Sequence, residues 1–283
     1  MALTVATCQF SVSADPRTNG AEIRRFIGEA AAQGANIVHV GECALSGYCR
    51  SNFPSWEGYN WLALRDEAQR VMDACSHHGI WAVVGSSHPL SNTNHPHNSV
   101  YIVTPDGRLA DRYDKRRCSP GDLTCYTPGD HPVVFEVKGV RCGVLVCMEE
   151  RFPDLWQAYA NDGVTLVFHS TSGSLTAAAD TDWTGMTGIL ARANAQHHQL
   201  FISQASWCPP FQEFPSLWVE RGGHAFRQCD RHVAGMMLNR IPDDAEKDGF
   251  YGMVRRFRAE ARSGALYAGH RCDDPRSRDR TTL

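Results

Sequence analysis

The sequence predicts an α/β protein with sheets inside and helices outside. Short apolar runs with the length of buried strands alternate with amphipathic helical patterns along the 283 residues. This alternation is typical of layered α/β folds. Neither a linker-like stretch nor an internal repeat interrupts the chain. We therefore expect one domain over residues 1–283, because a hydrophobic fraction of 42% suffices for a large core.

The first half of the chain predicts two helices among five strands. The first helix carries an apolar stripe that ends at Gly34, and the second carries one that ends at Gly79. The turn Pro105-Asp106-Gly107 separates the last two strands. In order, the expected elements are a strand over 3–10, a helix over 19–33, a strand over 37–40, a helix over 60–78, and strands over 81–85, 99–103 and 108–113.

The second half repeats this alternation and ends in a tail. Pro153 is well placed to open a helix directly after a strand. Segment 205–222 contains prolines and aromatic residues without periodicity, which predicts an irregular loop. The other expected elements are strands over 133–137, 142–147, 164–169 and 200–203, helices over 153–161, 180–198 and 250–262, a strand pair over 224–228 and 232–238, and an extended tail over about 263–283.

Composition and charge exclude several function classes. The net charge of −3 gives no electrostatic reason for binding nucleic acid or an anionic membrane, and no apolar run reaches the length of a membrane span. The N-terminus lacks the basic region of a signal peptide. Eleven cysteines, an odd number without framework spacing, favour the reducing cytoplasm. The sequence contains neither HExxH nor CxxC, so we expect no metal and no cofactor.

Three residues with reactive side chains each follow a strand-like run. Cys147 directly follows CGVLV, and Glu42 directly follows IVHVG. Lys115 follows RLADRYD and is one of only three lysines in the chain. Because the carboxyl ends of parallel strands meet at one edge of a sheet, these side chains are expected to gather there. Taken singly, each has an ordinary alternative: a buried cysteine that packs as a small hydrophobe, a solvated loop acid, or a surface cation.

Three segments, in this order, resemble the three blocks of the nitrilase-like carbon–nitrogen hydrolase superfamily: GECALSGY (41–48), YDK (113–115) and GVLVCMEERFPDLW (143–156). The segments TPGD (127–130), LARANAQHHQLFISQAS (190–206) and DPRSRDRTTL (274–283) are also similar to that family, so the resemblance covers nearly the whole chain. It implies a four-layer α-β-β-α sandwich. It also implies a homodimer or higher oligomer, with the C-terminal tail at a subunit contact.

The resemblance further implies a triad formed by Glu42, Lys115 and Cys147. A thiolate is a strong nucleophile, but an ordinary cysteine is mostly thiol at neutral pH and needs a base. Glu42 would take the proton, while Lys115 and a backbone N–H would stabilise the oxyanion, each donor worth on the order of 3 kcal/mol. Attack on a small amide or N-carbamoyl compound would give a thioester on Cys147. Water activated by Glu42 would then hydrolyse that thioester.

Two positions depart from the family's usual pattern. Asp122 stands where members often carry a second glutamate, seven residues before Gly129, and we expect it to act beside Lys115 in catalysis. Met148 stands where members usually have Tyr or Trp after the nucleophile. Its flexible thioether is expected either to line the substrate pocket or simply to fill a gap.

Four more residues are candidates for binding the substrate. His169 and Ser172 follow a predicted strand at a place where family members carry substrate-facing residues, and an ordinary polar turn is the alternative. Tyr48 and Trp183 are expected to line the pocket, with packing in the core as the alternative. We expect substrate specificity to reside in the loops 49–60, 116–126 and 205–222.

Two other functions stay open, and a third is discounted. Nitrile hydrolysis would use the same triad, although this chain has Cys-Met-Glu where many nitrilases have Cys-Trp-Glu. A non-catalytic binding member of the fold would explain the departures at Asp122 and Met148. A redox function would need a second thiol beside Cys147. Cys142 lies five residues earlier on the same strand and therefore on its opposite face.

Overall fold

The computed structural model describes residues 2–91, 94–173, 183–208, 212–242, 249–279 and 281. The chain separates into two compact units, Met1–Asp243 and Asp244–Leu283. All of the candidate catalytic and substrate-binding residues belong to the first unit. Each unit is described by itself.

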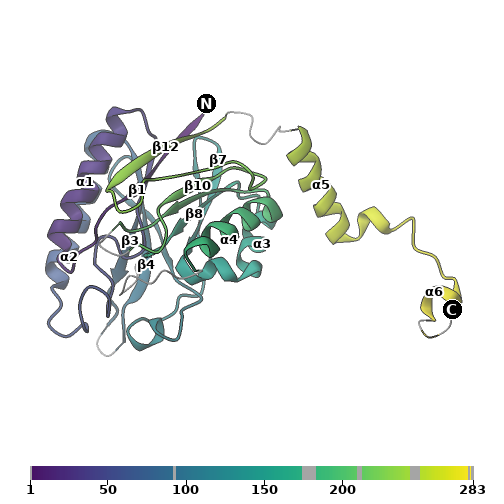
Figure 1. The fold of residues 1–283 in the computed structure, drawn as a ribbon, viewed down its shortest axis with the longest axis horizontal. Helices are drawn as coiled ribbons and strands as arrows, with labels where there is room; N and C mark the ends of the chain where they lie inside the picture. Colours follow the sequence, from purple (N-terminus) through teal and green to yellow (C-terminus); the bar gives the residue numbers. More distant parts are fainter. Residues whose placement is uncertain are drawn as a thin grey trace. The chain divides into compact units, whose positions relative to one another are not determined.

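The first unit contains two six-stranded sheets (Figure 1). In the first sheet the strand order is β12-β1-β2-β3-β4-β5. β1, β2 and β3 are parallel, whereas β4 is antiparallel to both β3 and β5. Because two reversals cancel, β5 runs in the same direction as β2. The strands are β1 (Leu3–Gln9), β2 (Ile37–His39), β3 (Trp81–His88), β4 (His97–Val103), β5 (Leu109–Asp114) and β12 (Gly235–Ile241).

The second sheet has the strand order β11-β10-β9-β8-β7-β6. β7, β8 and β9 are parallel, and the strands at both edges are antiparallel to their neighbours. The parallel centre is buried on both faces, which explains its nearly continuous apolar sequences. The strands are β6 (Val134–Val137), β7 (Val140–Val146), β8 (Leu166–Ser170), β9 (Phe201–Ala205), β10 (Leu217–Val219) and β11 (Phe226–Gln228).

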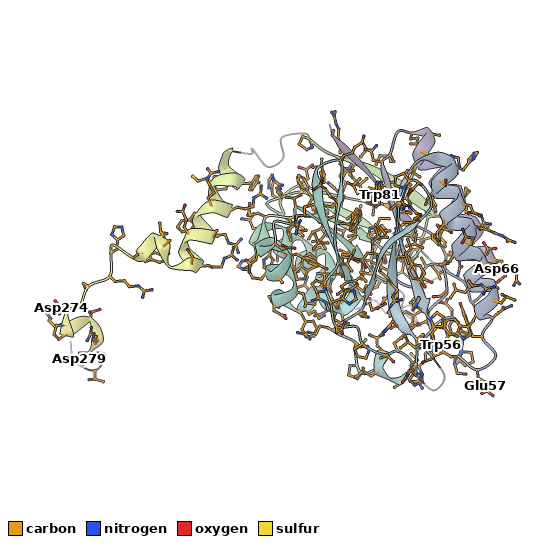
Figure 2. The ribbon with its side chains drawn as sticks, turned by 180° about the vertical axis from the view of Figure 1, so that it is seen from behind. Trp56, Glu57, Asp66, Trp81, Asp274 and Asp279 are labelled. Atoms are coloured by element: carbon orange, nitrogen blue, oxygen red, sulfur yellow. The ribbon has the colours of Figure 1, made fainter. Side chains whose placement is uncertain are left out.

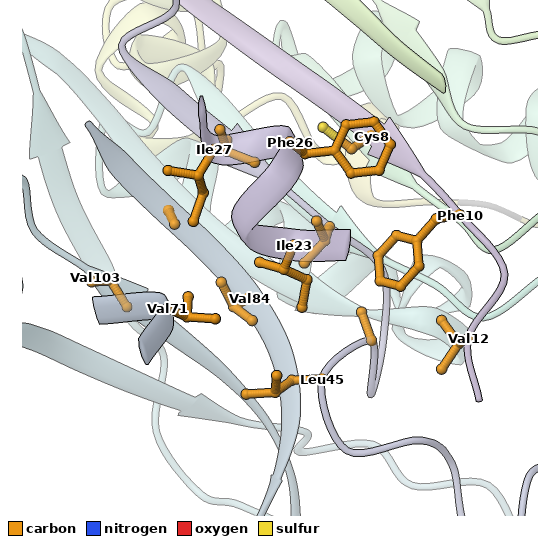
Figure 3. Packing of buried hydrophobic residues seen from close by; sticks show 14 of the residues in the cluster. Cys8, Phe10, Val12, Ile23, Phe26, Ile27, Leu45, Val71, Val84 and Val103 are labelled. Carbon is orange, nitrogen blue, oxygen red and sulfur yellow. The ribbon is translucent and has the colours of Figure 1, made fainter. Parts of the chain in front are cut away.

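Helices cover the outer face of each sheet. α1 (Pro16–Ala32) and α2 (Trp61–His78) lie side by side on the first sheet, and their apolar stripes pack onto its strands (Figures 1 and 3). α3 (Pro153–Asn161) and α4 (Trp183–His198) lie on the second sheet. The predicted α-β-β-α sandwich is confirmed.

The inner faces of the two sheets are joined by polar as well as apolar contacts. Thr7 Oγ1 on β1 lies 2.7 Å from Ser203 Oγ on β9. His39 on β2 lies within 2.9 Å of the same hydroxyl and within 3.0 Å of Ser170 Oγ on β8. Burial lowers the pKa of His39 well below its usual value, so this imidazole joins the sheets as a neutral group.

Aromatic rings extend the contact between the sheets. Trp81 on β3, labelled in Figure 2, stacks on Phe135 of β6 with ring centroids 6.0 Å apart. Phe135 in turn stacks on Phe168 of β8 at 5.9 Å. The sheets therefore form one core with the helices outside.

Within the first unit, the structure corrects three predicted elements. α1 begins at Pro16 rather than at residue 19, because Asp15 accepts a hydrogen bond from the Arg17 N–H as the N-cap and proline is favoured at the first helical position. Segment 205–222 is not wholly irregular, since it contains β10. The predicted strand pair over 224–228 and 232–238 is wrong: β11 pairs with β10 and β12 pairs with β1, so they lie in different sheets.

The second unit consists of α5 (Gly249–Ser263), the 3-10 turn η3 (Ala265–Tyr267) and α6 (Pro275–Arg278). The tail that was expected to be extended thus contains short helical segments. α5 exposes Phe250, Met253 and Phe257, which follow one another at helical spacing and form an apolar face. Among the described residues, no helix combines the length and apolar composition that a bilayer crossing requires.

We expect Gly85→Ala to destabilise the protein and Gly188→Ala to stabilise it slightly. A Cβ at Gly85 of β3 would lie 2.0 Å from the carbonyl oxygen of Gly41, in the segment that carries Glu42. The resulting overpacking costs about 1–3 kcal/mol. A Cβ at Gly188 of α4 meets no atom within 4 Å, and alanine gains about 0.5–1 kcal/mol in a helix. Thermal melting of both variants tests this, and equal melting temperatures would contradict it.

Candidate active site

The topology brings the ends of four strands to one place. Glu42 follows β2, and its N–H donates to the carbonyl oxygen of Thr171 after β8, at 3.1 Å. Lys115 is the first residue after β5, and Cys147 is the first residue after β7. The carboxyl ends of β2 and β5 in the first sheet therefore lie next to those of β7 and β8 in the second sheet. This is the edge at which ligands bind in α/β sheets.

The Lys115 ammonium lies between two carboxylates. It is 1% exposed, and its Nζ is 2.9 Å from Glu42 Oε1 and 2.9 Å from Asp122 Oδ2. Burial alone would lower the pKa of Lys115, but the neighbouring Glu42 and Asp122 carboxylates outweigh it and raise this pKa well above its usual value. Lys115 is thus a permanent cation, and pairing makes its burial tolerable.

Glu42 is fully buried and uses its two oxygens differently. Oε1 accepts from Lys115 and from Asn98 Nδ2, the latter at 2.7 Å. Oε2 has no hydrogen-bond partner among the described residues. Trp207 Nε1 donates to the carbonyl oxygen of Glu42 at 2.8 Å and fixes the backbone. One carboxylate oxygen is therefore held while the other remains open as an acceptor.

Asp122 joins Lys115 to the candidate pocket residue Tyr48. It opens the 3-10 turn η1 (Asp122–Thr124) and is 1% exposed. Its Oδ2 accepts from the Ser119 N–H at 2.8 Å, and Oδ1 accepts from the Tyr48 hydroxyl. Burial opposes ionisation of Asp122, but the charge of Lys115 and the bond from Tyr48 lower its pKa below the usual value. The shorter aspartate therefore still reaches the lysine.

Cys147 begins the 3-10 turn η2 (Cys147–Arg151) with a φ of 50°, in the left-handed region that a residue with a Cβ seldom adopts. Its carbonyl oxygen accepts from His169 Nε2 at 2.9 Å. Burial, followed by the charge of Glu42, raises the pKa of the Cys147 thiol well above its usual value, although Lys115 opposes this. The resting residue is thus a neutral thiol that needs a base.

His169 on β8 is fully buried. Burial lowers its pKa to about 4, so it is neutral at pH 7 and donates from Nε2 to Cys147. Met148 is 38% exposed beside the candidate nucleophile. The carbonyl oxygen of Ser172 accepts from the Trp207 N–H at 3.1 Å. Trp183 opens α4, but its side chain lies outside the described residues.

The sequence reasoning missed three residues that bind this site together: Asn98, Trp207 and Glu149. Asn98 and Glu149 are both polar residues close to the end of an apolar strand, which is a detectable signal. Trp207 lies just past β9 and gave no such signal. Among the described residues, no group of three or more His, Cys, Asp or Glu side chains is arranged to hold a metal ion.

The two-sheet sandwich with Glu, Lys and Cys at its strand ends defines the class of carbon–nitrogen hydrolases. The chain belongs to the carbon-nitrogen hydrolase family, whose sequence model matches residues 4–208. This match confirms the family that the motifs indicated.

Curated relatives and solved structures agree with this family. Omega-amidase NIT2 from Homo sapiens is 28% identical over 211 residues, which cover 71% of this chain and 73% of that protein. A chloroplastic omega-amidase from Arabidopsis thaliana is 26% identical over 217 residues, covering 71% of this chain and 56% of that protein. The crystal structure of an amidase from Nesterenkonia sp. has a TM-score of 0.73 at 22% identity, covering 90% of this chain and 96% of that one.

A second structure of that amidase is informative about its own chemistry. A mutant of it carries the acetamide moiety of fluoroacetamide, added covalently at the active site cysteine. Its TM-score to this chain is 0.74 at 22% identity, with coverage of 90% of this chain and 96% of that chain.

We expect Asp122→Asn to destabilise the protein by about 3 kcal/mol near neutral pH, because it leaves the buried Lys115 cation with one carboxylate fewer. The pKa of Asp122 is lowered on folding. The contribution of ionised Asp122 to the free energy of unfolding is therefore fully present above the unfolded-state pKa of about 3.9. This contribution is lost as the pH falls through the lower folded-state pKa. Urea unfolding of both proteins from pH 7 to pH 3 measures the difference. If the difference in unfolding free energy between the wild type and Asp122→Asn stayed constant from pH 7 to pH 3, Asp122 would not be the ionised partner of Lys115.

Proposed function

We propose that this protein hydrolyses the C–N bond of a small non-peptide amide through a thioester on Cys147. The observation that carries the proposal is the buried Lys115 ammonium beside Glu42, whose Oε2 is open to accept a proton. A neutral thiol, a base with one free oxygen and a fixed cation are the groups that acyl transfer requires.

In the first half of the reaction, Cys147 Sγ attacks the amide carbon while its proton passes to Glu42. The C–S bond forms as the carbonyl π electrons move to oxygen, and Lys115 stabilises the resulting oxyanion. Collapse of the tetrahedral intermediate then breaks the C–N bond. Glu42 returns its proton to the leaving nitrogen, and ammonia departs from a thioester.

In the second half, water attacks the thioester carbon and gives its proton to Glu42. Collapse of the second intermediate breaks the C–S bond, and the sulfur recovers the proton from Glu42. The acid leaves and the free enzyme is regenerated. Because the pKa of Lys115 is raised, the cation that both halves require stays charged over the whole physiological range.

The relatives' names support an amide as the substrate, since the curated proteins that match include omega-amidases. The fully buried catalytic carboxylate and lysine also favour a small substrate over a polymer. N-carbamoyl compounds and nitriles would use the same three groups, and comparing their turnover with that of primary amides separates these substrate classes.

We further propose that the protein acts in a reducing compartment, the cytoplasm, and that it assembles with copies of itself. All eleven cysteines are free thiols, which supports the first point. The apolar face of α5 formed by Phe250, Met253 and Phe257 supports the second, since exposed apolar faces of this kind mark protein contacts.

We expect Cys147→Ala to reduce ammonia release from small primary amides by about 10⁴-fold or more, because the covalent pathway is lost. Cys142→Ala is the matched control. Cys142 lies on β7, the strand that Cys147 directly follows; it is fully buried and has its Sγ 3.3 Å from the Val140 carbonyl oxygen. We expect this control to retain activity. Release by Cys147→Ala at the wild-type rate would contradict the proposed function.

A further inference from the structure

Glu149 lies two residues after Cys147, is fully buried, and accepts four hydrogen bonds. The mechanism proposed above does not use it. A buried carboxylate of this kind is costly unless each oxygen is well satisfied, so its partners indicate what it does.

The two oxygens of Glu149 serve two different segments. Oε1 accepts from the backbone N–H groups of Arg116 and Arg117, at 2.8 and 3.0 Å. Oε2 accepts from the backbone N–H of Val146 at 2.8 Å and from the Tyr113 hydroxyl at 2.7 Å. Arg116 and Arg117 directly follow Lys115, and Tyr113 precedes Lys115 by two residues. Val146 directly precedes Cys147.

We propose that Glu149 is a positioning residue that fixes the Lys115 loop and the end of β7 relative to each other, so that the ammonium and the thiol meet the same substrate carbonyl. This inference rests on the proposed function. β5 and β7 belong to different sheets, and Glu149 bridges them with a single side chain. Glu149 binds the N–H of Val146, and His169 binds the carbonyl oxygen of Cys147. These two hydrogen bonds stabilise the left-handed backbone conformation of Cys147.

The chemistry of the four bonds requires a carboxylate. Three of the donors are backbone N–H groups, which cannot reverse their direction, whereas the Tyr113 hydroxyl can turn and accept. A glutamine amide would therefore place its NH₂ toward Tyr113 and Val146. This orientation keeps the two bonds after Lys115 but loses the one before Cys147.

The test is the turnover of Glu149→Gln with a small primary amide, expressed per folded molecule. We expect kcat to fall by about a hundredfold, the usual cost of misplacing reacting groups by about 1 Å, with KM unchanged. A merely structural role would lower the melting temperature and leave kcat unchanged. The inference is overturned if Glu149→Gln keeps kcat within about fivefold, the size of one ordinary hydrogen bond.

Tyr113→Phe is the matched control. It removes the hydroxyl donor and leaves the carboxylate with its three backbone partners, so we expect kcat to stay within about fivefold of wild type. If kcat of Tyr113→Phe fell a hundredfold, the tyrosine hydroxyl rather than the Glu149 carboxylate would be required, and the inference would be wrong. If Glu149→Gln does not fold, Glu149→Asp retains both acceptor oxygens one methylene further back. It should then lower kcat with KM unchanged, and full kcat would overturn the inference.

Failure of the proposed function would be visible separately, as absence of ammonia release by the wild type. In that case the rate at which iodoacetamide alkylates Cys147 decides the positioning role. A slower rate in Glu149→Gln than in Tyr113→Phe supports it. Equal rates overturn it.

Discussion

The burial of the Lys115 ammonium between two carboxylates is the constraint on which the rest of the site depends. An unpaired charge in this position would cost several kcal/mol, so the ion pairs with Glu42 and Asp122 contribute substantially to the stability of the folded chain. Glu42 comes from the end of β2, Lys115 from the end of β5 and Asp122 from the turn η1. The pairing therefore fixes the geometry of three separate segments of the chain.

Around this ion pair the structure keeps the candidate nucleophile neutral. Burial and Glu42 raise the pKa of Cys147 more than Lys115 lowers it, which suits attack assisted by a base rather than by a preformed thiolate. The remaining contacts hold the parts in place: Asn98 and Trp207 hold Glu42, Tyr48 holds Asp122, and His169 holds the Cys147 carbonyl. Among the described residues, Glu42 Oε2 and His169 Nδ1 are the buried atoms of these side chains that have no hydrogen-bond partner.

The apolar runs predicted a layered α/β fold and most of its strands, because each buried strand is a short apolar run with a clear end, and the family resemblance implied the four-layer sandwich. It also placed Glu42, Lys115 and Cys147 at such ends. It could not predict that Asn98 contacts Glu42, because these residues are 56 positions apart. It also could not predict that Glu149 binds the residues next to Lys115 and Cys147, because those segments belong to different sheets. The assignment of β11 and β12 to different sheets was hidden for a similar reason: strand periodicity does not identify the pairing partner.

The most direct test of this account is to treat the protein with fluoroacetamide, a weak electrophile, and to map the adduct by mass spectrometry. Trypsin releases residues 142–151 as one peptide that contains both Cys142 and Cys147. The account predicts acetamide on Cys147, none on Cys142 or on the exposed Cys272, and loss of labelling in Lys115→Met. Labelling of Cys272 at the same rate as Cys147, or labelling that does not depend on Lys115, would contradict it.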